Sequence, residues 1–233
     1  MIYKISNYIC EVYSPASGEI FNLAGLIAKD LGETIKEYID GGKFGHAYKT
    51  ESNKVLKITA DLAELELAHK LSKNRNWSTN IVNYYNIGYI KFTKEVSSYL
   101  GKFIGYILMD EIINKISDKE KTIIDSIYQR YIRFTPRYSD FLELPVSEII
   151  DDNQEDIKGK NINIQDIIEL HPNIVELVKD AKTHKIKMLD FQASNLGWNS
   201  DHTKLIMFDL TGIFPHKNEL KINTIWIDPS NLK

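Results

Sequence analysis

Residues 185–212 restrict the possible folds of this chain more than any other stretch. Within it, Asp190 and Asp209 each follow an apolar run, and Asn195 lies between them. The segments on either side of residues 199–203 have the apolar and turn residues of a short β-hairpin. Such a hairpin brings Asn195 and Asp209 close together, and their oxygens suit Mg²⁺, which completes its coordination with water and phosphate oxygens. The stretch therefore predicts a site for magnesium and phosphate.

A glycine-rich hairpin is predicted in the N-terminal half. From Glu33 the sequence alternates with a period of two, passes through the segment DGGKFGHAYK and continues as a second strand. Gly42 and Gly45 lack a Cβ, so backbone amides at the hairpin tip can face a phosphate group. Gly42 and Lys43 are followed by Phe44, which excludes a Walker motif, and no helix follows the glycines, which argues against a dinucleotide fold.

Lys57 lies inside the apolar strand predicted at residues 55–59. A lysine there must either extend to water or pair with an anion. The helix predicted next in the sequence places Glu64 on one face with Ala68 and Leu71, at helical spacing. Glu64 is therefore the better candidate for the partner of Lys57, although a solvated position on the helix surface is the other interpretation.

At these positions the chain resembles the protein-kinase-like family. The catalytic and metal loops of that family follow the pattern Asp-x-x-x-x-Asn, then an apolar strand and a second Asp. Here these residues are Asp190, Asn195 and Asp209. The glycine-rich hairpin, the strand lysine and the helix glutamate precede them in the family's order, so the resemblance covers about residues 33–212. It implies an α+β, bilobal fold with an antiparallel N-lobe sheet, one helix of the αC type and a mostly helical, minimal C-lobe.

The resemblance also implies a domain organisation. Residues 1–109 would form the N-lobe, 110–112 the hinge, and 113–233 a reduced helical C-lobe. Few residues remain after Gly212, so the helices with which protein kinases hold peptides are not expected. The elements that we expect are a helix at 15–31, strands at 55–59, 81–89 and 103–109, a loop at 151–160, and a helix with Pro172 in its first turn.

The resemblance implies ATP and Mg²⁺ as ligands. Asp190 would act as the catalytic base or orient the acceptor hydroxyl, and Asn195 and Asp209 would bind the metal. Lys57 would hold the phosphates. The residues matched to the nucleotide site are Gly42, Phe44, Gly45, Ala47, Lys57, Glu64, Met109 as gatekeeper, and Asp110 and Ile112 through their backbone.

Three departures from the family pattern bear on function. Asp40 occupies the position of the first glycine and brings a carboxylate near the phosphates, which would lower nucleotide affinity. Leu189 replaces the Arg before the catalytic Asp, so a switch by activation-loop phosphorylation is not expected. Gln192 replaces the usual Lys and brings no charge to the transferred phosphoryl group, which fits slower transfer or a non-protein acceptor.

Two classes of function are consistent with these residues. The first is a phosphotransferase that transfers the γ-phosphoryl group of ATP to a hydroxyl of a protein Ser/Thr or of a small molecule. The second is a pseudokinase that binds nucleotide, or only a partner, and acts as a regulatory module. Nucleotidyl transfer from a reversed ATP orientation is a third, minor alternative.

Composition restricts the class of protein, its binding partners and the cellular compartment in which we expect it. A hydrophobic fraction of 43% and a charged fraction of 26% argue against disorder and against a membrane protein. The net charge of -3 gives no reason to expect nucleic-acid binding. Cys10 is the single cysteine and cannot form an internal disulfide. The N-terminal residues lack the apolar core of a secretory signal, so we expect a cytoplasmic protein.

Overall fold

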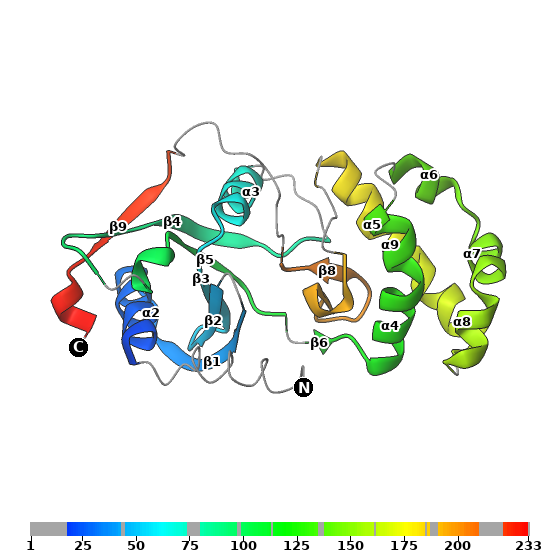
Figure 1. Cartoon of the computed structure of the whole chain (residues 1–233), viewed down its shortest axis with the longest axis horizontal. Helices are drawn as coiled ribbons and strands as arrows, with labels where there is room; N and C mark the ends of the chain where they lie inside the picture. Colours follow the sequence, from blue (N-terminus) through cyan, green and yellow to red (C-terminus); the bar gives the residue numbers. More distant parts are fainter. Residues whose placement is uncertain are drawn as a thin grey trace. The chain divides into compact units, whose positions relative to one another are not determined.

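The chain is described here from a computed structural model (Figure 1). The described residues are 18–42, 45–73, 80–96, 99–112, 114–134, 138–160, 162–184, 186, 191–209 and 221–232. They form an α+β structure of two compact units. The first unit contains the described residues within 1–74, 83–111 and 214–233, and the second contains those within 75–82 and 112–213.

A mixed six-stranded sheet forms the centre of the first unit. Its strands are β1 (Ile35–Gly41), β2 (Gly45–Thr50), β3 (Lys54–Thr59), β4 (Tyr84–Phe92), β5 (Gly105–Asp110) and β9 (Asn223–Ile227). Their order across the sheet is β1-β2-β3-β5-β4-β9. Neighbouring strands are antiparallel except β9, which runs parallel to β4. The glycine-rich hairpin predicted from the sequence is therefore confirmed as β1 and β2.

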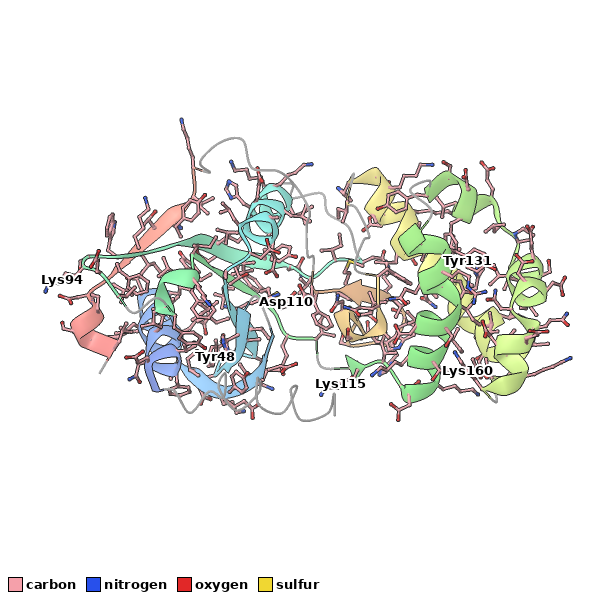
Figure 2. All side chains as sticks on the ribbon, in the orientation of Figure 1. Tyr48, Lys94, Asp110, Lys115, Tyr131 and Lys160 are labelled. Atoms are coloured by element: carbon pink, nitrogen blue, oxygen red, sulfur yellow. The ribbon has the colours of Figure 1, made fainter. Side chains whose placement is uncertain are left out.

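Helix α2 (Gly18–Asp30) packs against one face of this sheet and buries its apolar side there (Figure 1). Tyr48, labelled in Figure 2, is fully buried in the cluster between helix and sheet. Gly88 is paired with Tyr106 in the sheet, and a Cβ on Gly88 would lie 2.4 Å from the Tyr106 hydroxyl oxygen. The tyrosine ring therefore needs a glycine beside it in order to pack on this face.

Helix α3 (Leu62–Ser72) covers the opposite face. Side chains alternate between the two faces along a strand. Since Leu56 and Ile58 point toward α2, the side chains of Val55 and Lys57 point toward the other face. A Cβ on Gly105 would lie 2.7 Å from the Leu65 side chain of α3, which shows how closely this helix approaches the sheet.

Strand β9 was not anticipated, and it changes the expected division of the chain. The sequence predicts one reduced helical lobe for residues 113–233. In the structure, residues 221–232 belong to the first unit instead, where β9 pairs in regular register with β4. Ile225 and Ile227 of β9 are buried in the cluster under α2, and burial of these side chains favours this position.

The second unit consists of helices and a three-stranded sheet. Its helices are α4 (Asp118–Ile123), η2 (Ile124–Tyr128), α5 (Gln129–Phe134), α6 (Tyr138–Glu143), α7 (Val146–Asp152), α8 (Gln154–Gly159) and α9 (Ile164–Thr183). The sheet has the order β6-β7-β8, with β6 (Asn114–Lys115), β7 (Leu196–Trp198) and β8 (Leu205–Met207). Segment η2 is a turn of π-helix, which joins α4 to α5 without a break. Figure 2 labels Tyr131 on α5 and Lys160 directly after α8.

Two expectations for the second unit were wrong. The loop expected at 151–160 is helical, because the polar segment Gln154–Gly159 buries Ile157 while its other residues remain exposed or half-buried. Pro172 lies inside α9 and not in its first turn. The helix starts earlier because Asn163 accepts a hydrogen bond from the Gln165 backbone N–H and forms a capping box with Asp166.

The other expected elements are present with shifted ends. Helix α2 lies within the expected range 15–31, of which residues 15–17 are outside the described part of the chain. The expected strands correspond to β3, β4 and β5, and β4 starts three residues later than expected, at Tyr84. Among the described residues, no helix is both long enough and apolar enough to cross a membrane.

Replacement of Ile27 by alanine tests whether α2 is an integral part of the first unit. Ile27 is fully buried against the sheet, so Ile27→Ala should lower the free energy of unfolding by about 2 to 5 kcal/mol. Ile39→Ala is the matched control, because Ile39 is 46% exposed on β1 and should change stability little. Urea unfolding followed by circular dichroism measures both. Equal losses would contradict the packing of α2 described here.

Candidate functional site

A buried ion pair joins β3 to α3 in the first unit. The Lys57 Nζ lies 2.6 Å from Glu64 Oε1, and the side chains are 13% and 5% exposed. The Thr59 hydroxyl donates to Glu64 Oε2 at 2.9 Å. Asp61 caps α3 and accepts from the backbone N–H of Glu64 at 3.2 Å, which fixes the first turn of the helix. From the sequence, Glu64 could also have been solvated on the helix surface. The structure shows that Glu64 is buried and paired with Lys57.

Gly45 is a glycine of the hairpin where backbone atoms leave no room for a side chain. A Cβ on Gly45 would lie 2.6 Å from the backbone oxygen of Ile58, so no other residue fits without a shift of the backbone. Gly42 has open space at its Cβ position, and its N–H donates to the Gly45 carbonyl at 2.9 Å. Asp40 accepts from the Gly41 backbone N–H at 2.7 Å through its carboxylate. Phe44, expected at the tip, lies outside the described residues.

The predicted adenine-covering and gatekeeper residues lie on the same face of the sheet as Lys57. Ala47 pairs with Lys57 across β2 and β3, and Met109 pairs with Val55 across β3 and β5. Paired residues point to the same side of a sheet, and so do residues two apart on a strand. Ala47, Val55, Lys57 and Met109 therefore line one face, on the side covered by α3.

Asp110 is held by a local network at the end of β5. Its backbone N–H donates to the Asn83 carbonyl at 3.0 Å. Its carboxylate accepts from Asn83 Nδ2 at 2.7 Å and also from the Tyr85 hydroxyl. The hydrogen bond to Asp110 raises the pKa of Tyr85 to about 12. The N–H of Asp110 is therefore already engaged within the first unit.

The residue after Asp110 carries an ion pair that the sequence analysis missed. Lys49 Nζ lies 2.7 Å from Glu111 Oε1, and this hydrogen bond raises the pKa of Lys49. The alternation of β2 places Lys49 on the same face as Ala47. The pair therefore connects the strand after the glycine turn to the segment that follows Asp110.

Ile112, the third expected hinge residue, belongs to the second unit and packs on the β7 strand. A Cβ on Gly197 would lie 2.1 Å from Ile112 Cγ2, so the side chain of Ile112 occupies the space above this glycine. Gly197 in turn pairs with Lys115 of β6. The position of Ile112 thus depends on the absence of a side chain at Gly197.

The predicted hairpin is present as β7 and β8, and it brings the backbone of Asn195 beside that of Phe208, the residue before Asp209. Leu196 pairs with Met207, and the Phe208 N–H donates to the Asn195 carbonyl at 3.1 Å. Asp209 is the next residue in the chain. The side chain of Asn195 is buried, and its Oδ1 accepts from the Ser194 hydroxyl at 3.5 Å.

Asp125 fixes the turn that carries Asn195, and sequence reasoning missed it. Its Oδ1 accepts from the Ala193 backbone N–H at 2.8 Å, at the start of the short helix η3 (Ala193–Asn195). Asp125 lies in the π-helical turn η2, a structure often found at functional sites. The only sequence signal is a carboxylate within an apolar helical segment.

Asn80 supports the same hairpin through two hydrogen bonds to strand β8. Its side chain donates to the Leu205 carbonyl at 3.0 Å, and its own carbonyl accepts from the Met207 N–H at 2.9 Å. Asn80 is 1% exposed, so both bonds are shielded from water. The strand that ends just before Asp209 is thus hydrogen-bonded on both sides.

The donor set of Asn195 and Asp209 fits Mg²⁺. One carboxylate and one amide oxygen are ligands that this cation accepts while it retains water and phosphate oxygens. Among the described residues, no three His, Cys, Asp or Glu side chains are grouped as metal ligands. Asp190, the expected catalytic base, lies outside the described residues, whereas Gln192 is described and has an extended backbone.

No protein-family model matches the chain, and no curated protein sequence is similar to it. The function of the chain is therefore inferred from its own residues and their contacts. The strongest of these are the Lys57–Glu64 pair in the first unit and, in the second, the hairpin that carries Asn195 and leads to Asp209.

Gly42 and Gly45 of the hairpin should differ in their tolerance of a methyl group. Gly45→Ala forces its Cβ against the Ile58 backbone, so the free energy of unfolding should fall by about 1 to 3 kcal/mol. Gly42→Ala, the control, meets no atom within 4 Å and should be nearly neutral. Chemical denaturation compares the two variants. A neutral Gly45→Ala would show that the strands lie farther apart than described.

His46 should make stability depend on pH. It is 3% exposed, packs against Phe103 with ring centroids 5.5 Å apart, and burial lowers its pKa below the usual 6.5. The unfolded chain therefore binds a proton that the folded chain rejects, and stability falls as the pH drops below about 6.5, by at most about 1.4 kcal/mol per pH unit for one proton.

His46→Phe should reduce this slope, whereas His202→Asn should not, because His202 is exposed in the turn between β7 and β8. Urea midpoints between pH 7.5 and 5.5 give the slopes. The same slope in wild type and His46→Phe would mean that His46 is protonated in the folded state.

Proposed function

We propose that this chain is an ATP- and Mg²⁺-dependent phosphotransferase with a protein-kinase-like bilobal fold, which transfers the γ-phosphoryl group to a hydroxyl acceptor. The observation that carries the proposal is the buried Lys57–Glu64 pair, at 2.6 Å, on the sheet face that also bears Ala47 and Met109. In kinases an ion pair between a strand lysine and a helix glutamate positions the lysine for the phosphates of ATP.

The first unit supports the proposal through the combination of its parts. A glycine hairpin, the strand that carries Lys57 and the helix that carries Glu64 follow one another in the chain. They also pack within one unit, in which β1 to β5 form an antiparallel array with α3 on the face of Lys57. Strand β9 and helix α2 are additions to this arrangement.

The second unit supports the proposal through its hairpin. Asn195 and Asp209 are brought together by β7 and β8, and their oxygens suit Mg²⁺. Bound Mg²⁺ would neutralise negative charge on the phosphates during transfer. Asn195 and Asp209 would hold the ion, Lys57 would contact the α- and β-phosphates, and Asp190 would accept or orient the proton of the acceptor hydroxyl.

A pseudokinase is the alternative, and two residues favour it. Gln192 supplies no charge at the position where kinases have a lysine, and Asp40 brings a carboxylate to the glycine hairpin. The Asp40 carboxylate accepts a hydrogen bond from the neighbouring Gly41 N–H, so this negative charge is held near the hairpin backbone. Such a protein would bind nucleotide weakly, or only a partner, and would transfer no phosphate.

The proposal predicts separate effects on binding and on transfer. With Mg²⁺ and ATP at 100 times the Kd, the free energy of unfolding of the wild type should increase by about 2.7 kcal/mol. This increase corresponds to a rise in Tm of roughly 5 to 10 °C. Asp190→Asn should keep this rise but lose about 10² to 10⁴ in the transfer rate, measured with γ-labelled ATP. Lys57→Met should lose both. Asp201→Asn, in the exposed turn after β7, is the carboxylate control and should change neither.

The outcomes separate the two hypotheses. A rise in Tm without transfer by wild type would favour the nucleotide-binding pseudokinase. No rise in wild type would leave only a partner-binding function. Equal transfer rates in wild type and Asp190→Asn would remove Asp190 from the mechanism, and mass spectrometry of the protein after incubation with ATP would distinguish added phosphate from added AMP.

A further inference from the structure

The two edges of the six-stranded sheet differ in their protection. Strand β1, at one edge, contains Lys36, Glu37 and Asp40, and its pairing with β2 is interrupted by two register shifts. Charged side chains and bulges are the features by which proteins prevent edge strands from pairing with other chains. Edge β1 is therefore protected against association.

Strand β9, at the other edge, has neither form of protection. Its sequence is NTIWI, without a charged residue or proline, and its register with β4 is regular from Asn223 to Ile227. Trp226 is 62% exposed, the largest value among the exposed large hydrophobic side chains described. An uncharged, regular edge strand with an exposed tryptophan has the character of an interface.

The backbone groups of β9 that face away from β4 can be identified. The Ile227 carbonyl accepts from the Thr93 N–H at 3.0 Å, so Ile227 faces β4 with its backbone. Successive residues alternate in this direction, so Ile225 also faces β4. The N–H and C=O groups of Thr224 and Trp226 then point outward, where no further strand of the described sheet lies.

We propose that two copies of this chain associate through antiparallel pairing of their β9 strands, with the two-fold axis at Ile225. In this register Thr224 of one copy faces Trp226 of the second copy, and the reverse holds by symmetry. Both residues have outward backbone groups, so each facing pair exchanges two hydrogen bonds. The edge is thus complementary to itself, as a two-fold interface requires.

The side chains fit this register. Ile225 and Ile227 are buried under α2, so Thr224 and Trp226 point to the other face, where Lys91 Nζ lies 5.8 Å from the Trp226 ring centroid. Pairing brings the two tryptophans into diagonal positions across the axis, within reach of aromatic side chains. Tryptophan is among the residues that contribute most to binding at interfaces.

The charges on either side of β9 also favour a second copy as the partner. The same register places Lys221 one residue from the position that faces Asp228 of the second copy. Lys221 is exposed, and Asp228 is exposed enough that its ion pair with Lys94, at 3.9 Å, is loose. Opposite charges therefore meet at both ends of the paired strands. The pairing is short, so the dimer should be weak and its formation should depend on concentration.

Thr224→Pro is the sharpest variant for a test. The outward N–H of Thr224 takes no part in the pairing of β9 with β4, so proline there removes one donor from each copy and keeps the sheet. Sedimentation velocity of the full chain, from micromolar to near-millimolar concentration, measures the dimer. Thr224→Pro and Trp226→Lys should each raise the dimer Kd by about tenfold or more.

Ile39→Lys is the matched control, because it replaces an exposed apolar residue on the opposite edge strand and should leave the Kd unchanged. Circular dichroism and Tm confirm that each variant is folded. A wild type that stays monomeric at every concentration would overturn the proposal, and so would a dimer that Thr224→Pro and Trp226→Lys leave unchanged or that Ile39→Lys dissociates.

Discussion

The Lys57–Glu64 ion pair is the interaction on which the candidate site of the first unit depends. Two charges with side chains 13% and 5% exposed lose most of their hydration, so each is costly without the other. The Thr59 hydroxyl satisfies the second oxygen of Glu64, and Asp61 fixes the helix turn from which Glu64 projects. The pair therefore ties the first turn of α3 to β3 and fixes the position of the Lys57 ammonium group.

Local patterns in the sequence predict much of this arrangement. The glycine turn between alternating segments, the lysine within an apolar strand and the helical spacing of Glu64 each involve few neighbouring residues. The proximity of Asn195 and Asp209 follows equally from a short hairpin. These features could be predicted because a turn or a helix face fixes which side chains lie together over such short distances.

The features that were missed involve contacts between distant parts of the chain. Strand β9 pairs with β4, more than a hundred residues earlier, and nothing in the sequence NTIWI specifies that partner. The Asp125 carboxylate accepts a hydrogen bond from the backbone N–H of Ala193. Every residue except proline has such an N–H, so the identity of residue 193 does not reveal this partner. The helix Gln154–Gly159 was not predicted because Ile157 is its single buried residue, and one apolar residue shows no helical spacing in the sequence.

Strand β9 also explains why one edge of the sheet is left open. Without it, β4 would be the edge, and Ile90 of β4 would lose apolar neighbours in the cluster under α2. The addition of β9 buries Ile225 and Ile227 there, but each added strand presents a new row of outward N–H and C=O groups. Because β9 has no charge or bulge to block further pairing, the strand that completes the core also provides the surface at which a second copy can bind.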